Sequence, residues 1–279
     1  MTLENIIKRA SQKLKSFDIQ SCNLDAEIIL SNVLGTTRES LITKNKINIS
    51  TEDVKKYDIA IERRTKNEPV AYILGKKEFW SKDYVVNYST LIPRPESELL
   101  IYKLINYYNK KSINILDVGT GSGCILLSLL QELNLSRGTG IDISSDAIKV
   151  AKVNSKRFKL EDRSVFKVND INFFNEGKYD LIVSNPPYIA SKDIQKLSKD
   201  IVNYEPLEAL NGGADGLDLI KKVIYKSKYL LENSGLLAIE IGTNQYMKVS
   251  ELLRKNGFKE TAKEYDYFNN VRCIISTKM

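Results

Sequence analysis

The chain has 279 residues, of which 42% are hydrophobic and 28% are charged, a composition typical of globular proteins and unlike that of disordered chains. It contains no histidine, which excludes Ser-His-Asp triads, histidine-ligated metals and histidine general bases. The formal net charge is +7. Because the lysines are dispersed among acidic residues, we interpret this charge as a solvated surface, with an RNA-facing surface as the alternative.

Cysteine spacing and hydropathy narrow the class of protein further. Cys22, Cys124 and Cys273 form no Cys-x-x-Cys pair, so neither a disulfide framework nor a metal site is expected. The first residues lead into no apolar segment typical of a signal peptide. No apolar run approaches the roughly 18 residues that span a bilayer. We therefore expect a cytoplasmic protein with no membrane partner.

The first 75 residues show the periodicity of a small helical bundle. The expected helices are one with an apolar stripe from Leu3 to Leu14, one from about Asn23 or Asp25 to Gly35, a short one capped by Thr37, and one capped by Ser50 and ended by Pro69.

The next segment connects this bundle to the rest of the chain. Residues 79–86 mix aromatic and β-branched side chains, which favours a hairpin or an extended linker. Pro93 and Pro95 exclude a helix interior there, and a helix is expected to begin near Ser97. We predict three parts: a helical domain over 1–76, a hairpin linker over 77–96 and a catalytic domain over 97–279.

From Ile113 onward, short apolar runs alternate with helical patterns. Strands are expected at 113–117, 140–143, 165–168, 179–184 and 236–241, with two more over about 259–277. Helices are expected at about 125–130, 145–153, 216–233 and 246–253. This alternation predicts an α/β fold with a mostly parallel sheet covered by helices on both faces. Ligands bind such sheets at the carboxyl ends of the strands.

A glycine-rich turn follows the first of these strands. It runs from Asp117 through Val118, Gly119, Thr120, Gly121 and Ser122 to Gly123. Glycines allow a ligand to approach the backbone closely, and amides at a helix start can hold a carboxylate. The G-x-G-x-G spacing departs from the dinucleotide pattern. It resembles the D-x-G-x-G-x-G turn of class I methyltransferases, whose Rossmann-like domain binds S-adenosyl-L-methionine.

Two acidic residues at neighbouring strand ends complete the expected cofactor site. Asp142 closes the second strand and is followed by Ile143; its carboxylate can accept hydrogen bonds from both ribose hydroxyls. Asp170 and Ile171 follow the third strand and are expected beside the adenine. An ordinary strand-to-helix turn explains any one of Gly119, Gly121 and Gly123 alone, and Asp170 could be a plain turn residue.

The tetrapeptide Asn185-Pro186-Pro187-Tyr188 directly follows the fourth strand. Two prolines make it stiff, and a strand terminator would need only one of them. An amide nitrogen is a poor nucleophile because its lone pair is delocalised. The Asn185 side-chain oxygen and the Pro186 carbonyl can orient such a nitrogen and stabilise its developing charge, with Tyr188 as an aromatic wall. The tetrapeptide resembles the N-P-P-[YF] signature of methyltransferases that act on adenine amino groups and glutamine amides.

Further segments resemble, in order and spacing, the bacterial release factor glutamine methyltransferase family. They are residues 68–75, 78–80, 91–98, 205–210 and 212–217, and the resemblance extends over nearly the whole chain. Glu96 and Ser97 stand where the family usually has Asp and Thr, and Ile171 where an aromatic residue is often found. The resemblance implies a substrate, the glutamine of the Gly-Gly-Gln motif in class I peptide chain release factors. It also implies that the helical domain helps to grip that partner and that no direct nucleic-acid binding is required.

Three other functions remain open from the residues alone. An N6-adenine methyltransferase fits the tetrapeptide and the basic charge, although such an enzyme must extrude its base and the bundle has no concentrated basic stripe beyond Arg63 and Arg64. A silent cofactor-binding module would not need Asn185. An arginine or lysine methyltransferase would need carboxylates at the acceptor site, where Asn185 is neutral.

Overall fold

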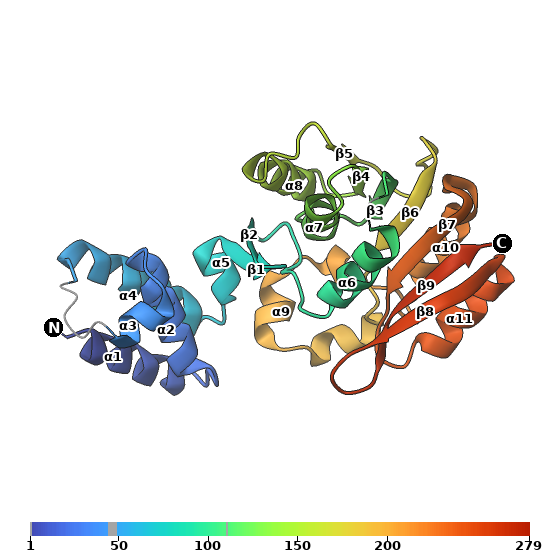
Figure 1. The fold of residues 1–279 in the computed structure, drawn as a ribbon. Helices are drawn as coiled ribbons and strands as arrows, with labels where there is room; N and C mark the ends of the chain where they lie inside the picture. Colours follow the sequence, from blue (N-terminus) through green and yellow to red (C-terminus); the bar gives the residue numbers. More distant parts are fainter. Residues whose placement is uncertain (1, 44–48, 110) are drawn as a thin grey trace. The chain divides into compact units, whose positions relative to one another are not determined.

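The computed structural model describes residues 2–43, 49–109 and 111–279 (Figure 1). The chain divides into two compact units. The first comprises Met1–Lys76 together with Ser198–Tyr204, and the second comprises Lys77–Leu197 and Glu205–Met279. The functional division into a docking domain, a linker and a catalytic domain remains a prediction.

The first unit is helical and begins with the expected bundle. Its helices are α1 (Leu3–Ser16), α2 (Cys22–Val33), α3 (Arg38–Thr43), α4 (Thr51–Thr65), α5 (Val70–Leu74) and α9 (Lys199–Tyr204). The predicted caps form, because Thr37 Oγ1 accepts from the Ser40 amide and Ser50 Oγ accepts from the Asp53 amide. The core of the unit includes Leu14, Ile29 and Tyr57, all fully buried.

Pro69 was expected to end the fourth helix, and this expectation is wrong. Helix α4 already ends at Thr65, and Pro69 is instead the residue from which α5 starts. Pro69 is the N-cap of α5, with a φ of −57° and a ψ of 137°. No intrahelical hydrogen bond uses the N–H of this position, so the missing N–H of proline costs nothing there.

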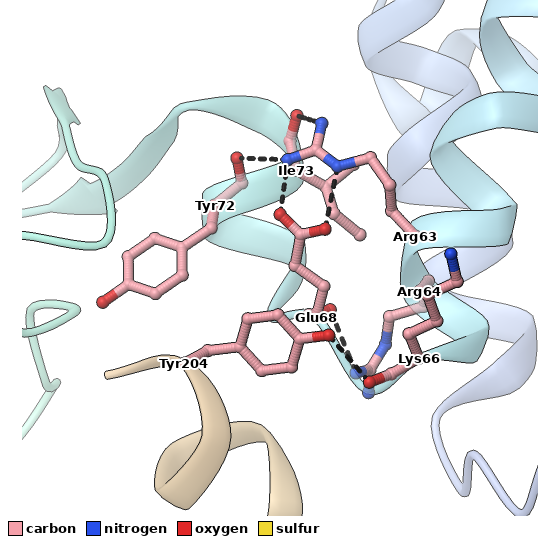
Figure 2. Close-up of polar contacts among 7 residues, drawn as sticks. All are labelled: Arg63, Arg64, Lys66, Glu68, Tyr72, Ile73 and Tyr204. Atoms are coloured by element: carbon pink, nitrogen blue, oxygen red, sulfur yellow. Dashed lines mark hydrogen bonds and ion pairs between the residues drawn. The ribbon is translucent and has the colours of Figure 1, made fainter. Parts of the chain in front are cut away.

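Two arginines at the end of α4 fix this turn (Figure 2). Arg63 binds the Glu68 carboxylate with two nitrogens. Arg64, nine-tenths buried, donates to Asp25 Oδ2 at 2.7 Å and to the Glu68 carbonyl at 3.2 Å. The Tyr204 hydroxyl of α9 donates to the Lys66 carbonyl at 2.9 Å (Figure 2). Both arginines are therefore engaged inside the unit.

The second unit opens with a hairpin and is built on a seven-stranded sheet. The hairpin pairs β1 (Lys76–Phe79) with β2 (Lys82–Val85). The sheet strands are β3 (Asn114–Val118), β4 (Arg137–Asp142), β5 (Ser164–Val168), β6 (Tyr179–Ser184), β7 (Leu231–Glu240), β8 (Phe258–Tyr265) and β9 (Val271–Lys278). Their order is β5-β4-β3-β6-β7-β9-β8, parallel from β5 to β7 and antiparallel at β9 and β8.

Helices cover both faces of this sheet (Figure 1). One face packs against α6 (Ser97–Tyr108), α7 (Cys124–Glu132) and α8 (Ser145–Arg157), and the other against α10 (Asp218–Leu230) and α11 (Tyr246–Lys255). Alternate strand residues serve the two faces: Ile115 lies in the first core and Leu116 in the second. This arrangement confirms the predicted α/β fold and places the carboxyl ends of β3 to β7 at one edge.

Short helices are what the sequence pattern did not predict. Besides α5 and α9, the chain forms 3₁₀ turns at Ser191–Lys196 and Leu207–Ala209, around the expected catalytic segment. They are too short to show a helical apolar stripe. In the part of the chain that the structure describes, no helix has both the length and the apolar character needed to cross a membrane.

Candidate active site

A cavity of about 860 Å³ lies at the carboxyl ends of the parallel strands. It is lined by ten of the predicted site residues: Gly119, Thr120, Gly121, Ser122, Asp142, Ile143, Asp170, Ile171, Asn185 and Pro187. The structure thus brings the glycine turn, the two acidic strand ends and the tetrapeptide to one place. Asp117, Gly123, Pro186 and Tyr188 are not among the lining residues.

The glycine turn leaves its cavity side open. Gly119 and Gly121 have φ values of +72° and +54°, and a Cβ on either would meet no atom within 4 Å. A side chain there would fill the space in which a ligand can approach the backbone. The turn itself is held by Gly119 and Thr120 amides, which both donate to the Ile141 carbonyl, at 2.9 and 3.0 Å.

Asp117, at the start of this turn, is a buried acid with one carboxylate oxygen that accepts no hydrogen bond from the described part of the chain. Its Oδ2 accepts from the Thr120 hydroxyl at 2.7 Å. Asp117 Oδ1 and Ser122 Oγ are buried and find no partner among the described residues. Burial raises the pKa of Asp117 to about 7. A cationic amine such as that of S-adenosyl-L-methionine would satisfy the free oxygen and favour the ionised form of Asp117.

Asp142 is positioned by the backbone around it. Its Oδ2 accepts from the Gly121 amide and its Oδ1 from the Ser144 amide, both at 2.9 Å. Burial nevertheless raises the pKa of Asp142. Each oxygen retains a further lone pair for a hydroxyl, so the fixed carboxylate fits a ribose. After strand β5, Ile171 is buried, and Asp170 accepts a hydrogen bond from the Asn172 amide at 2.8 Å. This bond fixes the turn at the carboxyl end of β5.

Asn185 has one end of its amide engaged. Its Nδ2 donates to Ser97 Oγ at 3.0 Å, while its Oδ1 accepts no hydrogen bond from any residue that the structure describes. Asn185 and Pro187 line the cavity. The site therefore offers a side-chain acceptor beside a rigid backbone.

Tyr188 is anchored behind the cavity wall. Its hydroxyl donates to Glu240 Oε1 at 3.4 Å and accepts from Arg272 Nη2 at 3.0 Å. The Arg272 guanidinium lies 5.4 Å from the ring centroid, a cation–π contact. Burial, followed by the charge of Glu240, raises the pKa of Tyr188 to about 12. Tyr188 is thus a neutral, fixed ring.

Two flanking segments support the tetrapeptide from outside. A Cβ on Gly212 would lie 2.6 Å from the Pro187 carbonyl oxygen, and one on Gly216 would lie 2.4 Å from that of Tyr188. These glycines permit close backbone approach. Glu205 accepts from the Ile92 amide at 3.2 Å and pairs with Arg94 at 2.6 Å, which joins residues 91–95 to residues 205–210. The proline- and glycine-rich motifs thus form the wall around the cavity.

Sequence reasoning missed the polar residues that support the site. Glu240 ends β7 with 1% of its surface exposed, and Asn154 of α8 is fully buried. Asn154 binds the Val85 amide and carbonyl and the Ser122 carbonyl, and so links β2 to the glycine turn. Glu240 could have been predicted, because it is an acid at the end of the apolar strand expected at 236–241, and the same pattern identified Asp142. Asn154 left no such signal, because its partners are backbone atoms.

Comparison with known proteins decides the family. Residues 5–75 match the family model described as PrmC N-terminal domain, and residues 88–213 match the Methyltransferase small domain. A release factor glutamine methyltransferase from Buchnera aphidicola (subsp. Schizaphis graminum) is 41% identical over 100% of both chains. One from Clostridium acetobutylicum is 36% identical over 100% of this chain and 99% of its own. The chain belongs to the release factor glutamine methyltransferase family.

Membership in the release factor glutamine methyltransferase family makes the chain an S-adenosyl-L-methionine-dependent methyltransferase, as predicted. The open glycine turn and the free oxygen of Asp117 fit that cofactor. Among solved structures, the catalytic domain of hMettl16 in complex with an RNA hairpin aligns with a TM-score of 0.59 and 17% identity, covering 84% of each chain. This likeness supports the methyltransferase fold alone.

Proposed function

We propose that this chain transfers a methyl group from S-adenosyl-L-methionine to the side-chain amide nitrogen of a glutamine in a class I peptide chain release factor, within its Gly-Gly-Gln motif. The observation that carries the proposal is the Asn185 amide at the cavity wall, with Nδ2 held by Ser97 and Oδ1 available. The names of full-length relatives support the substrate. We place the reaction in the cytoplasm, where release factors act.

The chemistry follows from the two acceptors. An amide nitrogen carries two hydrogens, and Asn185 Oδ1 with the Pro186 carbonyl would accept one each. This fixes the nitrogen and favours the positive charge that develops on it. The cofactor supplies an electrophilic methyl group on a positively charged sulfur.

No general base is needed for this reaction. The methylated nitrogen is strongly acidic and gives its proton to water. In the methyl transfer that precedes this proton loss, the nitrogen–carbon bond forms and the sulfur keeps the electron pair of the sulfur–carbon bond that breaks. A chain without histidine can therefore perform the transfer.

We also propose that residues 1–76 dock the release factor. Support comes from their match to a family model separate from that of the methyltransferase domain. Arg63 holds Glu68 (Figure 2), and Arg64 holds Asp25. Both arginines are therefore committed to internal ion pairs instead of forming a phosphate-binding stripe. The adenine-directed alternative gains no support from them.

The test is methyl transfer from labelled S-adenosyl-L-methionine to a purified release factor. A Gln→Ala version of its Gly-Gly-Gln motif, duplex DNA and total RNA serve as parallel substrates. We expect label on the intact factor alone. Label on nucleic acid would overturn the substrate, and label on the Gln→Ala factor would overturn the target residue.

A further inference from the structure

Asn185 is the first member of a chain of hydrogen bonds that leaves the cavity. Asn185 Nδ2 donates to Ser97 Oγ at 3.0 Å, and Ser97 Oγ donates to Glu240 Oε2 at 2.5 Å. The other Glu240 oxygen, Oε1, accepts from the Tyr188 hydroxyl at 3.4 Å, and Arg272 Nη2 lies 4.0 Å from it. Both ends of the tetrapeptide, Asn185 and Tyr188, therefore connect to one carboxylate.

The direction of these bonds follows from the number of protons. A serine hydroxyl has a single proton, and Ser97 gives its proton to Glu240 when that carboxyl group is ionised. Ser97 Oγ must then accept from its other neighbour, and only the NH₂ end of the Asn185 amide can donate. The opposite end, Oδ1, is thereby turned away from Ser97. Without the acceptor at Glu240, the hydroxyl could donate to Oδ1 instead, and the amide could adopt either orientation.

Burial makes this arrangement specific. Ser97 is 2% exposed and Glu240 is 1% exposed, so water does not compete for their hydrogen bonds. Ser97 is the first residue of α6, and Glu240 is the last residue of β7. Strand β7 lies beside β6, and Asn185 follows β6 directly. Burying an acid such as Glu240 is costly unless the acid is hydrogen-bonded. Because Glu240 lies beside the tetrapeptide, we ask what its hydrogen bonds do there.

We propose that Ser97 and Glu240 are positioning residues that fix the orientation of the Asn185 amide, so that Oδ1 is the atom presented to the substrate nitrogen. The inference rests on the proposed function, since it deepens the role assigned to Asn185.

The first experiment compares three serine variants of the full-length enzyme with a release factor as substrate. Ser97→Ala should lower kcat about tenfold, the effect of one orienting hydrogen bond. The dissociation constant of S-adenosyl-L-methionine, measured by calorimetry, should not change. Ser97→Thr should retain the parental kcat. Ser128→Ala is the matched control, because Ser128 is equally buried and hydrogen-bonded to Tyr84, but lies outside the cavity wall; its kcat should be unchanged.

The second experiment separates positioning from a structural role. If Ser97 acts through Asn185, then Ser97→Ala should have little further effect in an Asn185→Ala background. Glu240→Gln, whose amide can turn either way, should lower kcat by several-fold in the parental background and also lose its effect with Asn185→Ala. An equal loss from Ser97→Ala in both backgrounds, or a loss of kcat in Ser97→Thr equal to that in Ser97→Ala, would overturn the inference. Full turnover of Asn185→Ala alone would instead overturn the role proposed for Asn185.

Discussion

The residues of the cavity fall into two sets that substitution should separate. Asn185→Ala removes the acceptor that we propose works on the substrate, so we expect turnover to fall by roughly 10²–10³ with cofactor affinity unchanged. Asp142→Ala removes a carboxylate fixed by the Gly121 and Ser144 amides. It should weaken cofactor binding by roughly 10–100-fold. Calorimetry with S-adenosyl-L-methionine and steady-state kinetics distinguish the two, and equal cofactor affinities in both variants would reject the division.

Glu240 should make the stability of the ligand-free protein depend on pH. Burial raises the pKa of Glu240 to about 7 from 4.5, against the opposing hydrogen bond from Ser97 and the charge of Arg272. Glu96 and Tyr188 are the other charged or titratable groups that act on it. A carboxyl group with a raised pKa binds its proton more tightly in the folded state. Its contribution is therefore fully present below pH 4.5 and is lost as the pH rises through about 7.

Glu240→Gln isolates this contribution. Denaturant unfolding of the parent and the variant between pH 4.5 and 8 should show the parent losing up to about 3 kcal/mol more than the variant. Asp117, whose pKa is also raised to about 7, remains in both proteins and cancels in the comparison. If the free energies of unfolding of the parent and the variant change equally with pH, the pKa of Glu240 is not raised in the folded protein.

At the scale of elements, regular periodicity decided what could be predicted. Strand β6 (Tyr179–Ser184) and helices such as α1 have many apolar residues at a fixed spacing, so the sequence alone located them. Helix α9 has six residues, none of them buried; a pattern needs more than two turns to be recognised. The partners of Glu240 and Asn154 come from segments 32 or more residues away in sequence, and only the fold brings them together.

The loop over 212–217 is an element whose glycines can be tested. Gly212 has no positive φ, so space alone opposes a side chain: its Cβ would lie 2.6 Å from the Pro187 carbonyl oxygen. Because backbone atoms cannot turn aside, Gly212→Ala should displace the tetrapeptide. A displacement near 1 Å lowers kcat by about 100-fold, and cofactor affinity should change little.

Gly138→Ala is the matched control for this loop. It also lacks a positive φ, and its Cβ would lie 2.3 Å from Leu126 Cδ1 in the core. Overpacking should cost it about 1–3 kcal/mol of stability while the folded enzyme keeps its kcat. Thermal unfolding and kinetics on both variants decide the matter: a kcat loss in Gly138→Ala as large as in Gly212→Ala would mean that crowding anywhere in the domain suffices.

At the scale of the whole molecule, the chain is not divided at a single point. Residues 198–204 belong to the helical unit although the residues on either side of them belong to the sheet unit. Tyr204 donates to the Lys66 carbonyl (Figure 2), and its neighbour Glu205 pairs with Arg94 in the cavity wall. Two consecutive residues thus attach to different units, which a reading of linear segments could not predict.

Hydrogen exchange should reveal this division when the cofactor binds. At a concentration one hundred times its dissociation constant, S-adenosyl-L-methionine should stabilise the sheet unit against opening by about 2.7 kcal/mol. Amides of 114–123 and 205–212 should therefore exchange more slowly. Amides of 199–204 should follow those of residues 3–43 and remain unchanged, because their contacts lie in the helical unit.

A conservative substitution gives the converse experiment. Tyr204→Phe removes only the hydroxyl that bonds to Lys66, so α9 should exchange faster while the glycine turn at 117–123 keeps its protection, with and without cofactor. If residues 199–204 instead gain protection together with 205–212 on cofactor binding, α9 opens with the sheet unit. The helical unit would then end at residue 76, and the contact between Tyr204 and Lys66 would carry no stability of its own.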